Sequence, residues 1–98
     1  MNITYRVDKD ILYIAIEGRI DASNAAIAEE KIFSIKNENE GKHTVIDADK
    51  LEYISSAGLR VLLATQKKMK DSMKLTNVCE LVMEVFELTG FADILVIE

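Results

Sequence analysis

The sequence predicts one α/β domain built around a single mixed β-sheet, with its elements in the order ββαβαβαβ. Two observations predict this class. Short apolar runs rich in β-branched residues alternate with segments in which apolar residues recur every three or four positions. The chain has 98 residues, 49% of them hydrophobic, which suits one core and leaves no room for a second domain. Short connections then imply an N-terminal hairpin followed by parallel strands joined through right-handed helical crossovers.

The N-terminal part predicts a hairpin and one helix. A strand at Ile3 to Val7 pairs with a second at Ile11 to Ile16, which we expect to be buried on both faces, around a turn at Asp8-Lys9-Asp10. A helix follows from about Asn24 to Asn37, with Ser23 or Asn24 available as its N-cap. Its apolar stripe has spacings of 3, 4 and 3 and consists of Ala25, Ala28, Ile32 and Ile35.

The remaining elements alternate between strand and helix. A solvated loop at Asn37 to Gly41 leads to a short strand at His43 to Asp47. A second helix of about four turns begins at Ser55 and Ser56. The order ends with a strand at Leu75 to Val78, a third helix closed by Gly90 at its C′ position, and a last strand at Ile94 to Ile97.

Apolar positions on these elements predict the core. We expect it to consist of Leu12, Ile14, Ile16, Val45, Leu59, Leu62, Leu75, Phe86 and Ile94. The buried side of the second helix is marked by Leu59, Leu62, Leu63 and Met69, and its wetter side by Arg60, Lys67, Lys68 and Lys70. The third helix is marked by Leu81, Val85, Phe86 and Leu88.

Composition narrows the class of partner. A net charge of −5 argues against nucleic-acid binding, because that affinity depends on clustered Lys and Arg. No apolar stretch approaches the roughly 20 residues of a membrane span, so no membrane insertion is expected. The single Cys79 cannot form an intramolecular disulfide, and no apolar run follows a basic start, which favours the cytoplasm over secretion. The expected partner is a protein.

No residue pattern indicates an enzyme. The only histidine, His43, opens a predicted strand, and Cys79 has no second cysteine, so no zinc site of ordinary spacing is expected. Neither GxxxxGKS/T nor GxGxxG occurs, and we expect no cofactor. Asp47 and Asp49 follow the end of a parallel strand, where a phosphate-accepting aspartate is one interpretation and a solvated loop is the other.

Ser55 and Ser56 stand where a loop meets the second helix. A hydroxyl there can cap the first amides of the helix, which stabilises it by about 1 kcal/mol. A phosphate attached there would face the positive end of the helix dipole. Gly58 keeps the first turn free of side-chain bulk, which we expect to leave the backbone open to a partner. Spacing alone leaves both interpretations open, a structural cap and a site of modification.

Three segments carry a resemblance to a known family. The segment Tyr53-Ile-Ser-Ser-Ala-Gly-Leu-Arg-Val-Leu-Leu63 resembles the signature of STAS domains, the anti-sigma factor antagonists of bacterial partner-switching pathways. Gly18-Arg-Ile-Asp-Ala-Ser-Asn-Ala25 resembles the Gly-x-Leu/Ile-Asp segment before the family's first helix, and Phe86-Glu-Leu-Thr-Gly-Phe91 its late Phe-x-x-x-Gly-Leu/Phe element. The resemblance covers essentially the whole chain, so we expect one STAS domain over residues 1–98.

The resemblance implies a sheet with helices packed mainly on one side. It also implies a phosphorylated serine two residues before Gly-Leu, which is Ser56 in this chain. Many phosphorylated antagonists carry Asp immediately before that serine, whereas this chain has Ser55, which makes Ser55 a rival acceptor. Asp21 is expected to come near the serine loop and to shape the surface that binds a kinase.

The implied function is that of an anti-sigma factor antagonist. The unmodified domain binds an anti-sigma factor that is also a serine kinase and thereby releases the sigma factor. Phosphorylation of Ser56 reverses the binding, and a serine phosphatase is a further candidate partner. The alternative is a non-phosphorylated STAS accessory subunit of a transporter or signalling scaffold.

The surface that binds the partner is expected where two segments meet at the same end of the sheet. These are the loop Asp21 to Asn24 and the start of the second helix, Ser55 to Arg60, whereas the third helix stays outside the surface. The candidate residues are Asp21, Ser23, Asn24, Ser55, Ser56, Ala57, Gly58, Leu59 and Arg60.

Overall fold

The computed structural model describes residues 1–69 and 73–98. The strands are β1 (Asn2–Asp8), β2 (Ile11–Ile20), β3 (His43–Asp47), β4 (Leu51–Ile54) and β5 (Met73–Thr76). The helices are α1 (Ala25–Asn37), α2 (Ser56–Met69) and α3 (Glu80–Thr89), followed by a short 3₁₀ helix, η2 (Phe91–Asp93). Within these residues no helix has the length and apolar character needed to cross a membrane.

The sheet is mixed, which confirms the predicted class. β1 and β2 form an antiparallel hairpin that runs from the pair Asn2 and Glu17 to the pair Asp8 and Ile11. β3 and β5 extend it in the order β1-β2-β3-β5, and β4 pairs with β2. All pairings beyond the hairpin are parallel, and α1 and α2 supply the crossovers that parallel strands require.

β2 serves two partners along one edge. Its first half, Ile11 to Ala15, pairs with β3, and its last residues pair with β4 after a register shift between Gly18 and Arg19. Gly18 has a φ of +90°, a conformation that glycine adopts without strain, and its amide donates to the Lys50 carbonyl at 2.8 Å. The end of β2 is therefore held against β4, not against β3.

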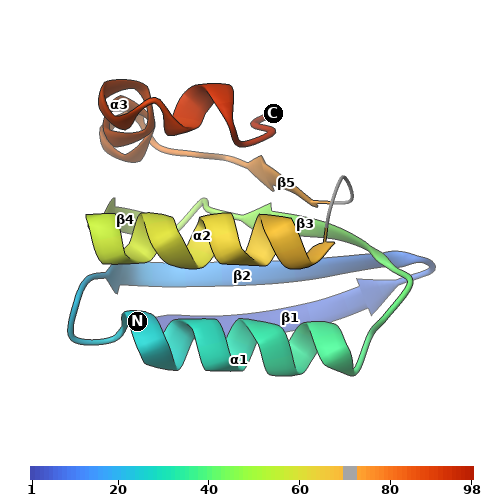
Figure 1. Ribbon diagram of the computed structural model, residues 1–98. Coiled ribbons are helices and arrows are strands. Elements are labelled where there is room, and N and C mark those ends of the chain that lie inside the picture. The colour runs from blue at the N-terminus through green and yellow to red at the C-terminus, as the bar shows by residue number, and fades with distance from the viewer. Residues whose placement is uncertain (70–72) are drawn as a thin grey trace.

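The helices α1 and α2 lie side by side on one face of the sheet (Figure 1). The β2 residues that face the helices are buried, and the others are half-buried except Arg19, which is exposed. The buried residues are Leu12, Ile14, Ile16 and Ile20. The expectation that this strand is buried on both faces is therefore wrong, because no described helix covers its other face. The prediction of helices mainly on one side is confirmed.

The core contains eight of the nine residues expected in it. The exception is Ile94, which is 48% exposed. The predicted last strand does not form, because η2 turns the chain at Phe91–Asp93 and only an isolated bridge joins Leu75 to Ile97. Leu95 is the buried residue of this segment instead.

α3 buries a narrower stripe than its sequence predicts. Val82 and Phe86 are buried, one helical turn apart, whereas Leu81 and Leu88 are exposed. α3 packs beside β4 and η2, so only one side of it meets the rest of the molecule. Gly90 ends the helix with a φ of +80°, as predicted.

Other boundaries also differ from the prediction. β2 continues past its predicted end at Ile16 and ends at Ile20. β4 was expected to be loop, but Leu51 and Ile54 are buried in it and pair it with the end of β2. β5 begins at Met73, two residues before the predicted start. The predicted inward side chain of Met69 and outward side chain of Lys70 lie outside the described part of the chain.

Candidate functional site

The ends of β2 and β4 bring the two predicted segments together. Ile20 and Ile54 are paired residues of these parallel strands, and the Ser55 amide donates to the Ile20 carbonyl at 2.9 Å. The next residue after β2 is Asp21, so the loop that begins there lies beside the start of α2. The loops at the carboxyl ends of parallel strands are where open α/β sheets place their sites.

The loop after β2 is held by its own side chains. The Asp21 carboxylate accepts from the amide of Ser23 at 2.9 Å and from its hydroxyl. Asn24 bridges the loop: its side-chain oxygen accepts from the Asp21 amide, and its side-chain nitrogen donates to the Arg19 carbonyl, both at 2.9 Å. Asn24 occupies the N-cap position of α1, but its side chain forms hydrogen bonds within the loop and none to the first amides of the helix.

The same contacts set the charge of Asp21. The hydroxyl of Ser23, followed by its amide, stabilises the carboxylate and lowers the pKa of Asp21 below its ordinary value. The Arg19 charge acts in the same direction. These contacts therefore favour the ionised form of Asp21.

The two serines have different positions at the start of α2. The Ser55 carbonyl accepts from the Leu59 amide at 2.9 Å, and its hydroxyl lies 3.4 Å from the Gly58 amide, which makes Ser55 the N-cap. Ser56 is the first helical residue and is exposed. Among the described residues nothing accepts from or donates to the Ser56 hydroxyl, so this hydroxyl faces solvent.

Gly58 has a different role from the predicted one. It is buried, and a Cβ placed on it would lie 2.5 Å from Cγ1 of Ile54 and 3.0 Å from Cγ2 of Ile20. The glycine lets the first turn of α2 sit directly on the ends of β2 and β4, and its backbone is not open to a partner. Leu59 is also buried. Gly58 and Leu59 were predicted to lie on the surface, but they pack under it and hold the start of α2 against the sheet.

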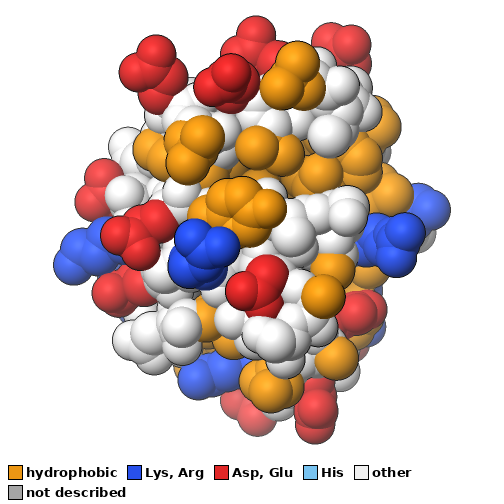
Figure 2. Space-filling model, turned by 90° about the vertical axis from the view of Figure 1, so that its left-hand side faces the viewer, with side chains coloured by type: hydrophobic (Ala, Val, Ile, Leu, Met, Phe, Trp, Pro, Cys, Tyr) orange, Lys and Arg blue, Asp and Glu red, His pale blue; other side chains and the backbone are white. Residues whose placement is uncertain are grey.

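The exposed part of the candidate surface is small and mixed in character. Ser23, Ser56 and Arg60 are exposed, and Asp21, Asn24, Ser55 and Ala57 are half-buried. Figure 2 looks onto this end of the molecule and shows hydrophobic side chains among acidic and basic ones. The sequence missed one feature here: the Arg19 guanidinium lies 4.4 Å from the centre of the Tyr53 ring, a cation–π contact between paired residues of β2 and β4.

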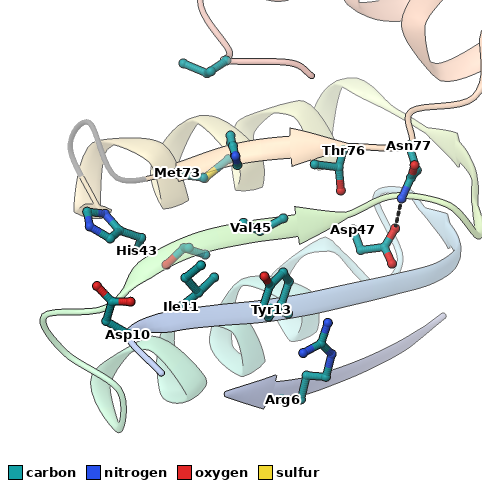
Figure 3. A pocket seen from close by; sticks show the side chains of 13 residues that line it. Arg6, Asp10, Ile11, Tyr13, His43, Val45, Asp47, Met73, Thr76 and Asn77 are labelled. Carbon is teal, nitrogen blue, oxygen red and sulfur yellow. Dashed lines mark hydrogen bonds between the residues drawn. The ribbon is translucent and has the colours of Figure 1, made fainter. Parts of the chain in front are cut away.

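A hollow lies elsewhere, on the face of the sheet that α1 and α2 do not cover. It has a volume of about 710 Å³, and its lining includes Tyr13 and Val45 (Figure 3). Asp47 borders it, but one oxygen of its carboxylate already accepts from the Asn77 side chain at 3.1 Å and the Asp49 amide at 3.0 Å. These bonds favour the structural interpretation of Asp47 over a phosphate acceptor.

His43 and Cys79 are not brought to the candidate surface. His43 begins β3 and lines the hollow on the uncovered face. The Cys79 thiol is half-buried before α3 and donates to the Leu51 carbonyl at 3.4 Å. Within residues 1–69 and 73–98, no cluster of three His, Cys, Asp or Glu side chains has the geometry of a metal site.

Comparisons of sequence and of structure with known proteins point to the same family. The family described as the STAS domain matches residues 2–98. The chain is 34% identical to BtrV of Bordetella bronchiseptica, a protein named as a candidate anti-sigma factor antagonist, over 96% of this chain and 83% of that protein. It is 29% identical to the anti-sigma-B factor antagonist of Bacillus subtilis, over 97% and 88%. The crystal structure of an anti-sigma factor antagonist from Mycobacterium paratuberculosis superposes with a TM-score of 0.85 at 20% identity, over 98% and 83%.

Proposed function

The chain belongs to the STAS domain family of anti-sigma factor antagonists, and we propose that it works as a phosphorylation-controlled partner switch. The unmodified domain binds an anti-sigma factor that is also a serine kinase, and this binding releases the sigma factor. Phosphorylation of Ser56 ends the complex, and a serine phosphatase restores it. The domain acts in the cytoplasm as ligand and substrate, and not as an enzyme.

The observation that carries this proposal is that Ser55 caps α2, whereas Ser56 is exposed beside it. The Ser55 hydroxyl and carbonyl are engaged in starting α2, whereas the Ser56 hydroxyl points to solvent at the same helix end. A kinase that docks here meets Ser56 without disturbing a cap. This geometry favours Ser56 over Ser55 as the acceptor.

The helix end can tolerate the modified side chain. The first amides of an α-helix have no partner within the helix, and a phosphate carries about −1.5 to −2 charges that they can stabilise. The dipole adds about 0.3–1 kcal/mol for an exposed group. Phosphorylation should therefore leave the fold intact.

The complex with the anti-sigma factor cannot accommodate a phosphate on Ser56 in the same way. An interface that covers the neutral Ser56 hydroxyl would have to strip water from a dianion, which costs several kcal/mol without a prepared cation. Each 1.4 kcal/mol lowers affinity tenfold. The switch therefore acts on binding and not on folding.

The test combines mass spectrometry with calorimetry. The chain is incubated with its candidate anti-sigma factor kinase and ATP, and the modified residue is identified in the wild type, Ser55→Ala and Ser56→Ala. Binding of the kinase is then measured for the wild type, Ser56→Ala and Ser56→Asp. We expect phosphate on Ser56 only, persistent binding of Ser56→Ala, and binding of Ser56→Asp weakened at least tenfold.

Two results would contradict the switch. Phosphate on Ser55 would assign the acceptor to the capping residue. Equal affinity of Ser56→Asp and wild type, with no phosphate transferred, would instead favour a STAS subunit that binds a transporter or scaffold unmodified. Ser55→Ala serves as the matched control, because it removes one hydroxyl from the same helix end.

A further inference from the structure

The outer edge of β1 carries backbone groups that no described strand pairs. β1 is the first strand in the order β1-β2-β3-β5 and forms the border of the sheet (Figure 1). A free edge presents a row of N–H and C=O groups that can pair with another strand. Which groups point outward follows from the contacts of β2.

Backbone groups alternate in direction along a strand. The Asp10 carbonyl, just before β2, accepts from the His43 amide at 2.9 Å, and the Gly18 amide donates to the Lys50 carbonyl, so even-numbered residues of β2 face β3 and β4. Odd-numbered residues therefore face β1. Their partners there include Thr4 and Arg6, which bond inward.

The residues that direct both backbone groups outward are then Ile3, Tyr5 and Val7. Their side chains share the helix face of the sheet, because Ile3 is buried there with 2% exposure. Tyr5 and Val7 are 48% and 42% exposed. Edge strands of monomers are usually blunted by charge or proline, and these three positions carry neither.

The helix layer shows an exposed apolar residue on the same side of the molecule. Phe33 of α1 faces α2, since the Lys68 ammonium lies 5.3 Å from the centre of its ring. At 100° per residue, Ile27 lies on the opposite flank of α1, away from α2. Ile27 is 62% exposed. Both layers therefore present apolar side chains along the β1 edge.

We propose that this edge joins a second copy of the chain through antiparallel pairing of the two β1 strands. Tyr5 lies opposite Tyr5 of the second copy, and Ile3 lies opposite Val7, so every outward group of these residues finds a partner. The arrangement is a two-fold symmetric dimer with one continuous sheet. The two α1 helices then lie on the same face of that sheet.

Charge and strand length select this register over its two neighbours. It sets Arg6 opposite Thr4, and Asp8 opposite Asn2, so no like charges face each other. A shift of two residues in one direction sets Arg6 opposite Arg6, and in the other direction leaves Val7 beyond the β1 span of the second copy.

Arg6 itself is drawn inward. Its guanidinium lies 4.0 Å from the centre of the Tyr13 ring on the uncovered face of the sheet (Figure 3). The net charge of −5 on each copy opposes association, but at about 0.15 M salt charges more than about 8 Å apart are largely screened.

The first test is the mass in solution, measured by light scattering after size exclusion. We expect twice the 11.0 kDa of one chain for the wild type and for Ser56→Asp. Tyr5→Pro removes an outward N–H and the exposed Tyr side chain while leaving the inward hydrogen bonds to β2 in place, and it should return the mass to that of one chain. A wild type that stays at 11.0 kDa at every concentration, or a Tyr5→Pro variant that stays dimeric, would overturn the proposal.

The second test covers the case in which Tyr5→Pro does not fold. In a Cys79→Ala background, Tyr5→Cys should form an intermolecular disulfide on mild oxidation, because the two residues face each other. Thr4→Cys is the matched control, since it lies opposite Arg6 and should crosslink much more slowly. Equal crosslinking of the two variants would refute the register. Failure of the Ser56 switch would leave these results unchanged.

Discussion

Gly58→Ala should destabilise the domain although it places a better helix former in a helix. The added Cβ would lie 2.5 Å from Cγ1 of Ile54, about 1 Å inside an ordinary carbon contact of about 3.5–4.0 Å. Overpacking of this kind costs about 1–3 kcal/mol, and the gain in helix propensity offsets up to about 1 kcal/mol. The expected net loss is about 1–2 kcal/mol, which lowers the Tm by about 5–15 °C.

Urea unfolding followed by circular dichroism measures this loss. The control is the pair Gly58→Ala and Ile54→Ala, combined in a double-mutant cycle. Ile54→Ala removes the clashing carbon, so the double variant should be more stable than the sum of the single losses predicts. If Gly58→Ala were as stable as the wild type, the first turn of α2 would have to sit farther from the sheet than described, and the placement of Ser56 would need revision.

Three other changes test separate parts of the structure. Leu62→Ala truncates a fully buried side chain of α2 and should cost about 2–5 kcal/mol in urea unfolding; a loss below about 1 kcal/mol would show that Leu62 lies outside the core. Arg60→Glu changes an exposed charge beside Ser56, so it should change the free energy of unfolding by no more than about 0.5 kcal/mol and should slow association with the anti-sigma factor. An unchanged association rate would place Arg60 outside the surface. Asp21→Asn should lower stability at neutral pH. The pKa of Asp21 is lowered in the folded state, so its contribution is present above the unfolded pKa of about 4 and disappears as the pH falls through the folded value. Urea melts at a series of pH values should therefore show the gap from the wild type closing only in acid, and a constant gap would contradict the assigned cause.

Elements with a complete local pattern could be predicted from the sequence. α1 repeats its buried residues over three turns, and the start of β2 is marked by its β-branched residues, so both elements could be predicted, although β2 continues beyond Ile16. The topology predicted that Asp21 and Ser55 lie at the same end of the sheet, since parallel strands end at the same edge, but their direct adjacency depends on β4, which was not predicted. These are properties that a segment carries in its own residues or in the order of its elements.

The remaining features depend on contacts between distant segments. β4 has only four residues, and it is a strand because the end of β2 pairs with it. The one-residue difference between Ile94 and Leu95 depends on the turn at η2, which no periodic pattern marks. Gly58 is buried because two isoleucines from different strands fill the space beside it, so its role is invisible in a motif.

Asn24 anchors the loop after β2 at both ends, and this has a consequence for the kinetics of recognition. A loop that is already ordered loses little conformational entropy when a second molecule docks on it. Docking at this end should need no conformational step in this loop, so the loop itself should impose no plateau on the observed rate as the partner concentration rises. Discrimination between related partners then resides in the residence time of each complex and not in its rate of formation.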